Sequence, residues 1–158
     1  MSAGAGSFVA VGDNVSPAPA GTAKSVLKVL AAANRAFKVT EVGVGFIGST
    51  GSAKPVLVEL CTGTEAGAGS GSSAVTPAQD DASDGNTVQA TAAKGFTSEP
   101  TVLTPVRRWR VHPQAGQITQ LPLGREVRSG VGKSVCLRVT FETGEATTNV
   151  DSYIGFEE

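Results

Sequence analysis

Short runs in which every second side chain is apolar constrain the fold of this chain more than any other feature. Residues 133–141 read KSVCLRVTF, with Val, Leu, Val and Phe at alternate positions. This period of two is typical of a β-strand with one buried face. Residues 55–61 and 150–156 show the same alternation, and in residues 107–112 a tryptophan and a valine alternate with arginines and a histidine. Strands are therefore predicted for all four stretches.

Helix signals are weak along the chain. The sequence contains 20 glycines and 8 prolines, and both residue types destabilise helix interiors. Residues 24–48 could begin as a helix, because their first apolar residues have helical spacing, but no capping box precedes them and β-branched residues are frequent. We predict a strand at 25–31, a turn near Asn34 and Arg35, and a strand from residue 36. The apolar face of this last strand switches once, which indicates a bulge or a crossing between two sheets.

Two segments lack such patterns. Residues 62–87 are dominated by Gly, Ser, Ala and acidic residues, and they are predicted to form a long, flexible surface loop that seeds no core. Residues 1–23, which include Pro17 and Pro19, predict an extended N-terminal arm or an edge strand followed by a linker. Residues 24–158 then form a single all-β domain, a β-sandwich of jelly-roll type.

The charge balance argues against two broad classes of function. The chain has 13 basic and 14 acidic residues, a net charge of −1. A general nucleic-acid binder or a polybasic membrane-surface protein would be strongly basic. No stretch approaches the roughly 20 apolar residues of a membrane span, and the N-terminus lacks the basic and apolar regions of a signal peptide. We expect no nucleic-acid partner, no membrane partner, and synthesis in a reducing cytoplasm.

The stretch SGVGKSV, Ser129 to Val135, resembles a phosphate-binding P-loop, since Gly132, Lys133 and Ser134 supply a bare backbone, an ammonium and a hydroxyl. A P-loop also needs a glycine five positions before Gly132, where Val127 stands. It must open a helix, whereas this stretch opens a predicted strand. A hairpin turn with permissive glycines is the preferred interpretation.

Two further motifs lack their structural context. GVGFIG, residues 43–48, fits the dinucleotide-binding pattern, but turn-forming residues follow it in place of a helix. DDASDGN, residues 80–86, resembles a calcium loop, but Ala82 and Thr91 stand where two ligands are needed. We predict a solvated acidic loop there, with weak cation binding left open.

Catalytic and metal-binding residues are scarce. Cys61, Cys136 and His112 cannot form a closed four-ligand zinc site. The cysteines are predicted to be free and partly buried, although a disulfide between neighbouring strands stays open. His112 is expected at the surface or at an interface. We therefore expect no catalytic residues, no metal site, no cofactor and no enzyme activity.

The C-terminal third, with WRVHPQAGQITQLPLGREV at 109–127, then LRVTF and VDSYIGFEE, resembles small structural proteins of tailed bacteriophages. The earlier run VLAAANRAFKVTEVGVGFIGST fits as well. The similarity covers about residues 24–61 and 105–158 and rests on overall pattern. The chain resembles capsid decoration (cement) proteins or minor virion proteins with jelly-roll folds. The 62–104 segment is the part least matched.

This resemblance implies a protein made in the host cytoplasm that binds the outside of the virion's capsid. Its expected partners are the major capsid protein and copies of itself, in a homotrimer. The contacts are expected from residues 1–23 and one rim of loops, so deletion of residues 1–20 would weaken capsid binding and leave the fold intact. The alternative is a receptor- or glycan-binding module of a tail fibre, because a jelly roll serves that role equally well.

Overall fold

The computed structural model describes residues 6–48, 54–81 and 85–158, and in these residues it contains strands and no helix. The predicted all-β sandwich is confirmed. The strands are β1 (Ser7–Val15), β2 (Ala23–Leu30), β3 (Phe37–Ile47), β4 (Val56–Thr64), β5 (Ser73–Val75), β6 (Ala78–Gln79), β7 (Thr91–Lys94), β8 (Leu103–Val111), β9 (Gln117–Gln120), β10 (Val127–Ser129), β11 (Lys133–Thr140) and β12 (Asn149–Glu157).

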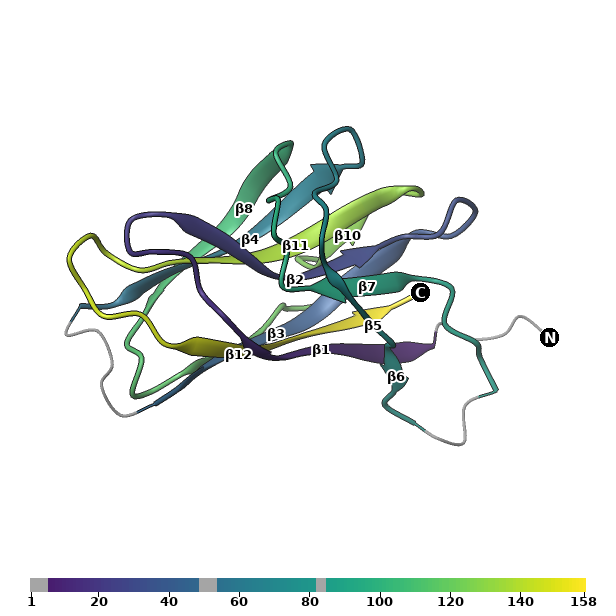
Figure 1. Cartoon of the computed structure of the whole chain (residues 1–158). Coiled ribbons are helices and arrows are strands. Elements are labelled where there is room, and N and C mark those ends of the chain that lie inside the picture. The colour runs from purple at the N-terminus through teal and green to yellow at the C-terminus, as the bar shows by residue number, and fades with distance from the viewer. Residues whose placement is uncertain (1–5, 49–53, 82–84) are drawn as a thin grey trace.

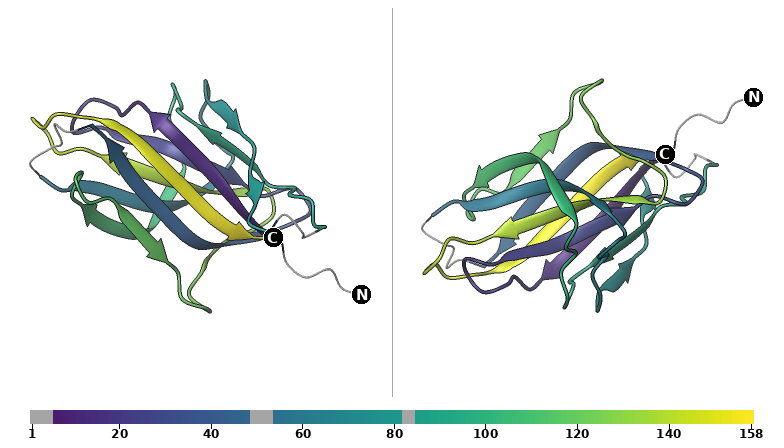
Figure 2. Two further views of the ribbon diagram at one scale, coloured as in Figure 1. Left: turned by 90° about the horizontal axis from the view of Figure 1, so that it is seen from below. Right: turned by 90° about the horizontal axis from the view of Figure 1, so that it is seen from above.

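The strands form two antiparallel sheets, which lie one above the other in Figure 1. Sheet A has the order β10-β3-β12-β1-β6, and β9 pairs with β3 beside β10. Sheet B has the order β5-β7-β2-β11-β4-β8. Figure 2 shows β3, β12 and β1 side by side from below, and β8, β4, β11 and β2 side by side from above.

The core fills the space between the sheets. The strand faces that the sequence predicted to be buried are buried: Val56, Val58 and Leu60 on β4, Val135, Leu137 and Val139 on β11, and Val150, Ser152, Ile154 and Phe156 on β12. Aromatic rings close one end, where the ring centroid of Phe156 lies 5.8 Å from that of Phe8 and 5.1 Å from that of Phe37. Alternating apolar residues thus supply one continuous core.

The predicted switch of face in residues 36–48 is a β-bulge. Glu41 pairs with Gly155 of β12, and the next pair is Val39 with Phe156, so Thr40 is an extra residue in β3. The bulge lets Phe37 and Val39 before it, and Val42 and Val44 after it, all lie in the core.

The prediction that residues 62–87 form one long loop is corrected for the described residues 62–81, which contain strands. Residues 62–64 complete β4, β5 extends the edge of sheet B, and β6 pairs with β1 in sheet A. Between these strands, backbone hydrogen bonds hold the chain, including Ser70 N–H to Ser98 O at 3.0 Å and Thr101 N–H to Gly67 O at 3.0 Å. Periodicity could not reveal this order, because backbone groups and not apolar side chains fix it.

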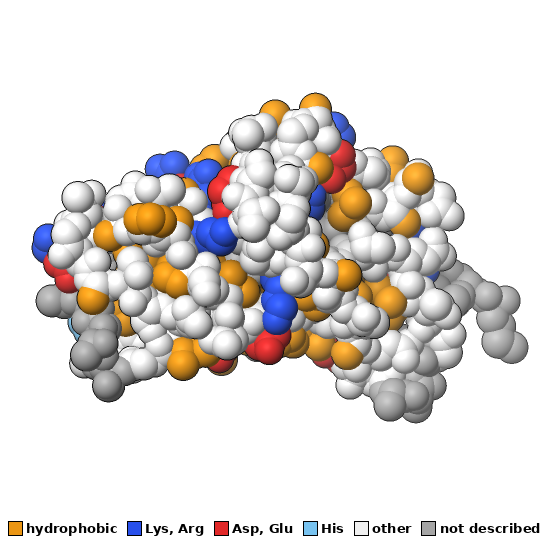
Figure 3. Space-filling view, in the orientation of Figure 1, with side chains coloured by type: hydrophobic (Ala, Val, Ile, Leu, Met, Phe, Trp, Pro, Cys, Tyr) orange, Lys and Arg blue, Asp and Glu red, His pale blue; other side chains and the backbone are white. Residues whose placement is uncertain are grey.

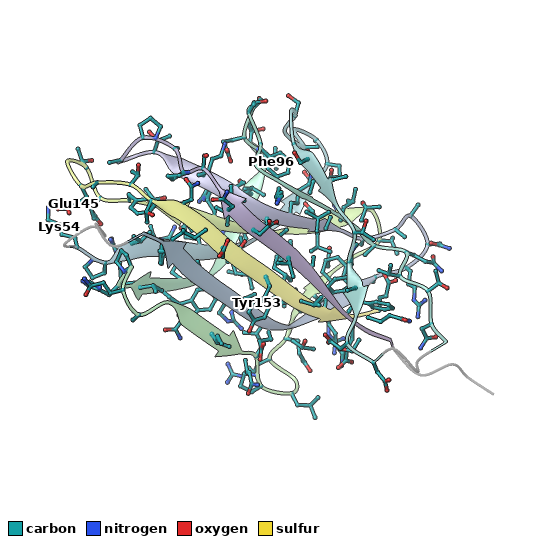
Figure 4. The ribbon with its side chains drawn as sticks, turned by 60° about the horizontal axis from the view of Figure 1, so that its bottom comes forward. Lys54, Phe96, Glu145 and Tyr153 are labelled. Atoms are coloured by element: carbon teal, nitrogen blue, oxygen red, sulfur yellow. The ribbon has the colours of Figure 1, made fainter. Side chains whose placement is uncertain are left out.

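Residues 65–72 and 95–101 together cover part of the outer face of sheet B. Phe96, labelled in Figure 4, is 2% exposed, and the ammonium of Lys28 lies 5.6 Å from its ring centroid. Lys28 also donates to Glu65 at 3.1 Å and to the carbonyl of Ala68 at 3.0 Å. This cover explains why Cys61 and Cys136, whose neighbours in sequence face the core, are themselves fully buried.

The described part of residues 1–23 begins at residue 6 and matches the edge-strand alternative of the prediction, because β1 lies near the edge of sheet A with only the short β6 beyond it. Within them β1 pairs with β12 along its length, and Phe8 and Ala10 are fully buried. The carbonyl of Glu158, at the other end of the chain, accepts hydrogen bonds from Gly6 N–H at 3.1 Å and from Arg35 at 2.8 Å. The expectation that residues 1–20 can be deleted without loss of the fold is therefore replaced by the opposite one, because Phe8, Ala10 and Val15 belong to the core.

Candidate functional site

The segment between β9 and β10 reaches outward from the edge of the sandwich (Figure 2). Its tip is a tight turn, in which Arg125 N–H donates to Pro122 O at 2.8 Å. Gly124 occupies the third position of this turn with φ +81°, a conformation that suits glycine and is typical of a type II turn. The turn places Leu123 at its outer corner. We call residues 117–126 the β9–β10 arm.

Apolar side chains on this arm face solvent. Leu123 is 90% exposed and Ile118, on β9, is 65% exposed, the two largest fractions among the exposed large hydrophobic residues that the structure describes. Singly exposed apolar residues are common on protein surfaces. Two on one projecting segment, however, are suited to contact with another protein.

Positive charge is concentrated in the same region of the sequence. Residues 107–133 contain six basic residues and a single acidic one, Glu126, although the whole chain carries a net charge of −1. Arg108 and Arg110 of this region pair with Glu59 and Glu142, and other charges of the chain are paired as well. In the face shown in Figure 3 several blue and red side chains lie next to one another. Examples on β2 are Lys24 with Glu99 at 3.2 Å and Lys28 with Glu65 at 3.1 Å.

A hollow separates the arm from sheet B. Its volume is about 460 Å³, and Arg107, Leu121, Pro122 and Arg125 line it. Arg107 spans the gap by donating to the carbonyl of Arg125 at 3.3 Å. The arm is also fixed at its base, where Leu121 N–H donates to Thr40 O at 2.8 Å. The exposed apolar tip therefore stands on an anchored support flanked by two arginines.

A row of charges crosses the outer face of sheet B. Glu59 on β4 is 3% exposed and stands directly between Arg138 on β11 and Arg108 on β8 in the strand register. One carboxylate oxygen lies 2.7 Å from Arg108 Nε, and the other lies 2.6 Å from an Arg138 terminal nitrogen. Sequence reasoning placed Glu59 in a strand but missed this role, because it depends on which strands are neighbours.

The GKS triplet lies at a turn, but the predicted hairpin is corrected. Gly132 has φ +61°, and Lys133 N–H donates to Gly130 O at 3.0 Å, so the chain turns there. The turn joins β10 of sheet A to β11 of sheet B, which are not paired with each other. Lys133 and Ser134 line a cavity at this corner.

The other two motifs show no ligand-binding geometry in their described residues. GVGFIG runs through the end of β3 without a helix after the strand among the described residues. In the acidic motif, residues 82–84 lie outside the described residues. Asp80 accepts a hydrogen bond from the Ser7 hydroxyl at 2.6 Å, so it is engaged within the fold. No group of three or more His, Cys, Asp or Glu side chains gathers to hold a metal ion in the described part of the chain.

The cysteines and the histidine are too far apart to cooperate. Cys61 and Cys136 are free thiols opposite each other on β4 and β11. Burial raises the pKa of Cys61 to about 11 and that of Cys136 to about 12. His112 follows the far end of β8, whereas Cys61 pairs with Pro105, a separation of roughly 20 Å along the strand. A nucleophilic Cys–His pair is therefore absent.

Comparisons with known proteins identify no relative: no protein family, no curated protein and no solved structure matches this chain. Among the described residues, no helix has the length and apolar character needed to span a bilayer.

Proposed function

We propose that this protein is a structural component of a phage virion, which binds the outside of the capsid as a symmetric oligomer and stabilises the shell. The observation that carries the proposal is the β9–β10 arm, with Leu123 90% exposed and Ile118 65% exposed on an anchored support. A protein that adds binding free energy only in the assembled lattice stabilises that lattice by mass action. The arm replaces residues 1–23 as the proposed contact region.

The strand order supports the finer assignment of a jelly roll. The central strands run β10-β3-β12-β1 in sheet A and β2-β11-β4-β8 in sheet B. Strands β1 to β4 alternate between the sheets, and β8, β10, β11 and β12 alternate again in the opposite sense. Eight strands wound in this way form the double-sheet jelly roll, the fold that the resemblance to phage decoration proteins implies.

The chemistry of the arm fits a protein partner. Leu123 and Ile118 provide apolar contact, and Arg107 and Arg125 line the hollow between the arm and sheet B with positive charge. The buried centres of protein interfaces are more apolar than the rest of the surface, and arginine is enriched in interfaces whereas lysine is depleted. The proposed binding surface on the major capsid protein is accordingly an apolar patch bordered by acidic residues. The second proposed partner is the chain itself, in a symmetric homotrimer.

The proposal is tested by counting copies in the particle. Quantitative mass spectrometry of purified virions should find this chain in numbers comparable with the major capsid protein. Sedimentation of the purified protein should show a trimer. A few copies per particle, located at the tail, would contradict the proposal and would favour the receptor- or glycan-binding module.

A further inference from the structure

A polar cavity opens at the corner of the sandwich where β4, β8, β10 and β11 meet. Its volume is about 330 Å³. The hydroxyl-bearing residues that line it are Thr62, Thr64, Thr104, Ser129 and Ser134, and the two cationic residues are Arg128 and Lys133. The Ser134 side chain lies on the other face of β11, toward Gly63. None of the lining residues is acidic.

The hydroxyls stand where core residues would be expected. Alternate residues of a strand share a face, and on β4 the face that buries Val56, Val58 and Leu60 continues as Thr62 and Thr64. Across the sheet, Thr62 is opposite Val135 on one side and Thr104 on the other. The sequence thus changes from apolar to hydroxyl side chains where the inner face meets the cavity.

The two cations, Arg128 and Lys133, form no ion pair within 4 Å among the described residues, whereas Lys24, Lys28 and Lys94 each do. Arg128 is nevertheless close enough to Glu126 to act, after the backbone N–H of Glu126 itself, in lowering the pKa of that carboxyl. Glu126 is the acidic residue closest to them in sequence, and its carboxylate lies 3.9 Å from the ammonium of Lys38. Ser129 donates at 3.5 Å to Gly130 O, which leaves its lone pairs as acceptors.

We infer that this cavity binds a phosphate or sulfate group carried on a polyhydroxyl body of monosaccharide size. A guanidinium and an ammonium are the donors that recognise oxyanions. The threonine hydroxyls donate and accept, as the hydroxyls of a sugar require. The volume lies at the lower end of the range for small-molecule sites, which is about 300–1,000 Å³, and it exceeds what a single ion fills.

This site uses part of the chemistry that the GKS triplet suggested, without a P-loop. Gly132, with φ +61°, allows the turn from β10 to β11, and residues on both sides of the turn, Arg128 and Lys133, line the same cavity. Neither the backbone cradle nor the helix N-terminus that binds a nucleoside triphosphate is present among the described residues. The inference does not depend on capsid binding, because the β9–β10 arm shares no residue with the cavity lining.

Isothermal titration calorimetry of the full chain with glucose 6-phosphate, inorganic phosphate and glucose tests the inference. Variants Arg128→Gln and Lys133→Gln each remove one cation from the cavity. The matched control is Arg110→Gln, which removes an arginine that pairs with Glu142 outside the cavity. Thr62→Val removes a hydroxyl and no charge, and thermal melting verifies that each variant is folded.

We expect glucose 6-phosphate to bind, and each cavity cation variant to weaken the binding by about tenfold or more, as loss of a charge-assisted hydrogen bond implies. Thr62→Val should weaken it less, and Arg110→Gln should leave it unchanged. Equal affinity for inorganic phosphate would identify the ion as the whole ligand and would overturn the sugar part of the inference. No binding at 10 mM, or equal weakening by Arg110→Gln, would overturn the site itself.

Discussion

Tyr153 on β12 lies directly across from Gly43 on β3, and its ring occupies the space that a side chain at residue 43 would need. A Cβ atom added to Gly43 would lie 2.0 Å from Tyr153 Cε1. The Tyr153 hydroxyl donates to the carboxylate of Glu41, two residues before Gly43 on the same strand. Figure 4 shows Tyr153 on the β12 and β3 side of the molecule.

Gly43→Ala should therefore destabilise the protein by about 1–3 kcal/mol, because the ring must move away from β3. Urea unfolding measures the change. Gly45→Ala is the matched control on the same strand, since no atom lies within 4 Å of a Cβ at that position. It should be neutral or slightly stabilising. Equal effects of the two substitutions would contradict the packing of Tyr153 over Gly43.

Glu59→Gln should cost about 1–3 kcal/mol of the free energy of unfolding. The substitution keeps the shape but removes the charge that two arginines share at a 3% exposed site. Glu142→Gln is the control, because the pair of Glu142 with Arg110 is exposed and surface pairs contribute about 0–1 kcal/mol. Urea unfolding at low and high salt measures the loss in the free energy of unfolding for each of the two variants. If Glu59→Gln proves as mild as Glu142→Gln, the buried charge row is not a stabilising element.

Removal of residues 1–20 should abolish folding. The deletion takes away β1, and Phe8→Ala alone should cost about 3–5 kcal/mol because the ring is fully buried against Phe156. Circular dichroism and thermal melting of the truncated chain provide the measurement. A truncated chain that melts cooperatively near the wild-type temperature would show that β1 is dispensable.

Alkaline pH should destabilise the protein through the buried thiols. The folded-state pKa values of Cys61 and Cys136, about 11 and about 12, exceed the ordinary value of 9.0, so the folded state retains protons that the unfolded state releases. This stabilisation is complete below about pH 9 and is lost as the pH rises toward 12. Each thiol contributes a slope of about 1.4 kcal/mol per pH unit between its two pKa values.

The comparison is urea unfolding between pH 8 and 11 for the wild type and Cys136→Ala. The variant should lose stability with pH less steeply. At pH 8, both cysteines should react with a thiol reagent far more slowly in the folded protein than in urea, because the thiolate is the reactive form. Identical slopes, or rapid labelling of the folded protein, would refute the burial of these thiols.

Much of the fold could be predicted because its core strands are amphipathic. Alternation on β4, β11 and β12 identified the buried faces. The changed spacing after Val39 indicated a bulge or a crossing between two sheets, and the pairing of β3 with β12 shows the bulge. The sequence of β1 left an extended arm and an edge strand open as alternatives, since SFVAVGDNV is short and is followed by Pro17 and Pro19. Only its pairing with β12 places it in the sandwich.

The surface features could be predicted far less well. The pairing of Glu59 with Arg138 requires the order of strands, and the cover over Cys136 is held by backbone hydrogen bonds that leave no periodic pattern. The excess of basic residues in 107–133 was visible in the sequence, but the partners of each cation were not. The GKS triplet fails the P-loop pattern because one glycine is missing. The cavity beside the triplet could not be predicted, because strands distant in sequence line it.

Binding of the purified protein to capsids that lack it tests the proposed role of the β9–β10 arm most directly. Leu123→Asp removes the apolar tip, and Val131→Asp is the matched control, because Val131 is 52% exposed on a different turn. Co-sedimentation with capsids should give saturable binding for the wild type and for Val131→Asp, and at least tenfold weaker binding for Leu123→Asp. Undiminished binding of Leu123→Asp would contradict the proposed contact, and failure of the wild type to bind would contradict the capsid function.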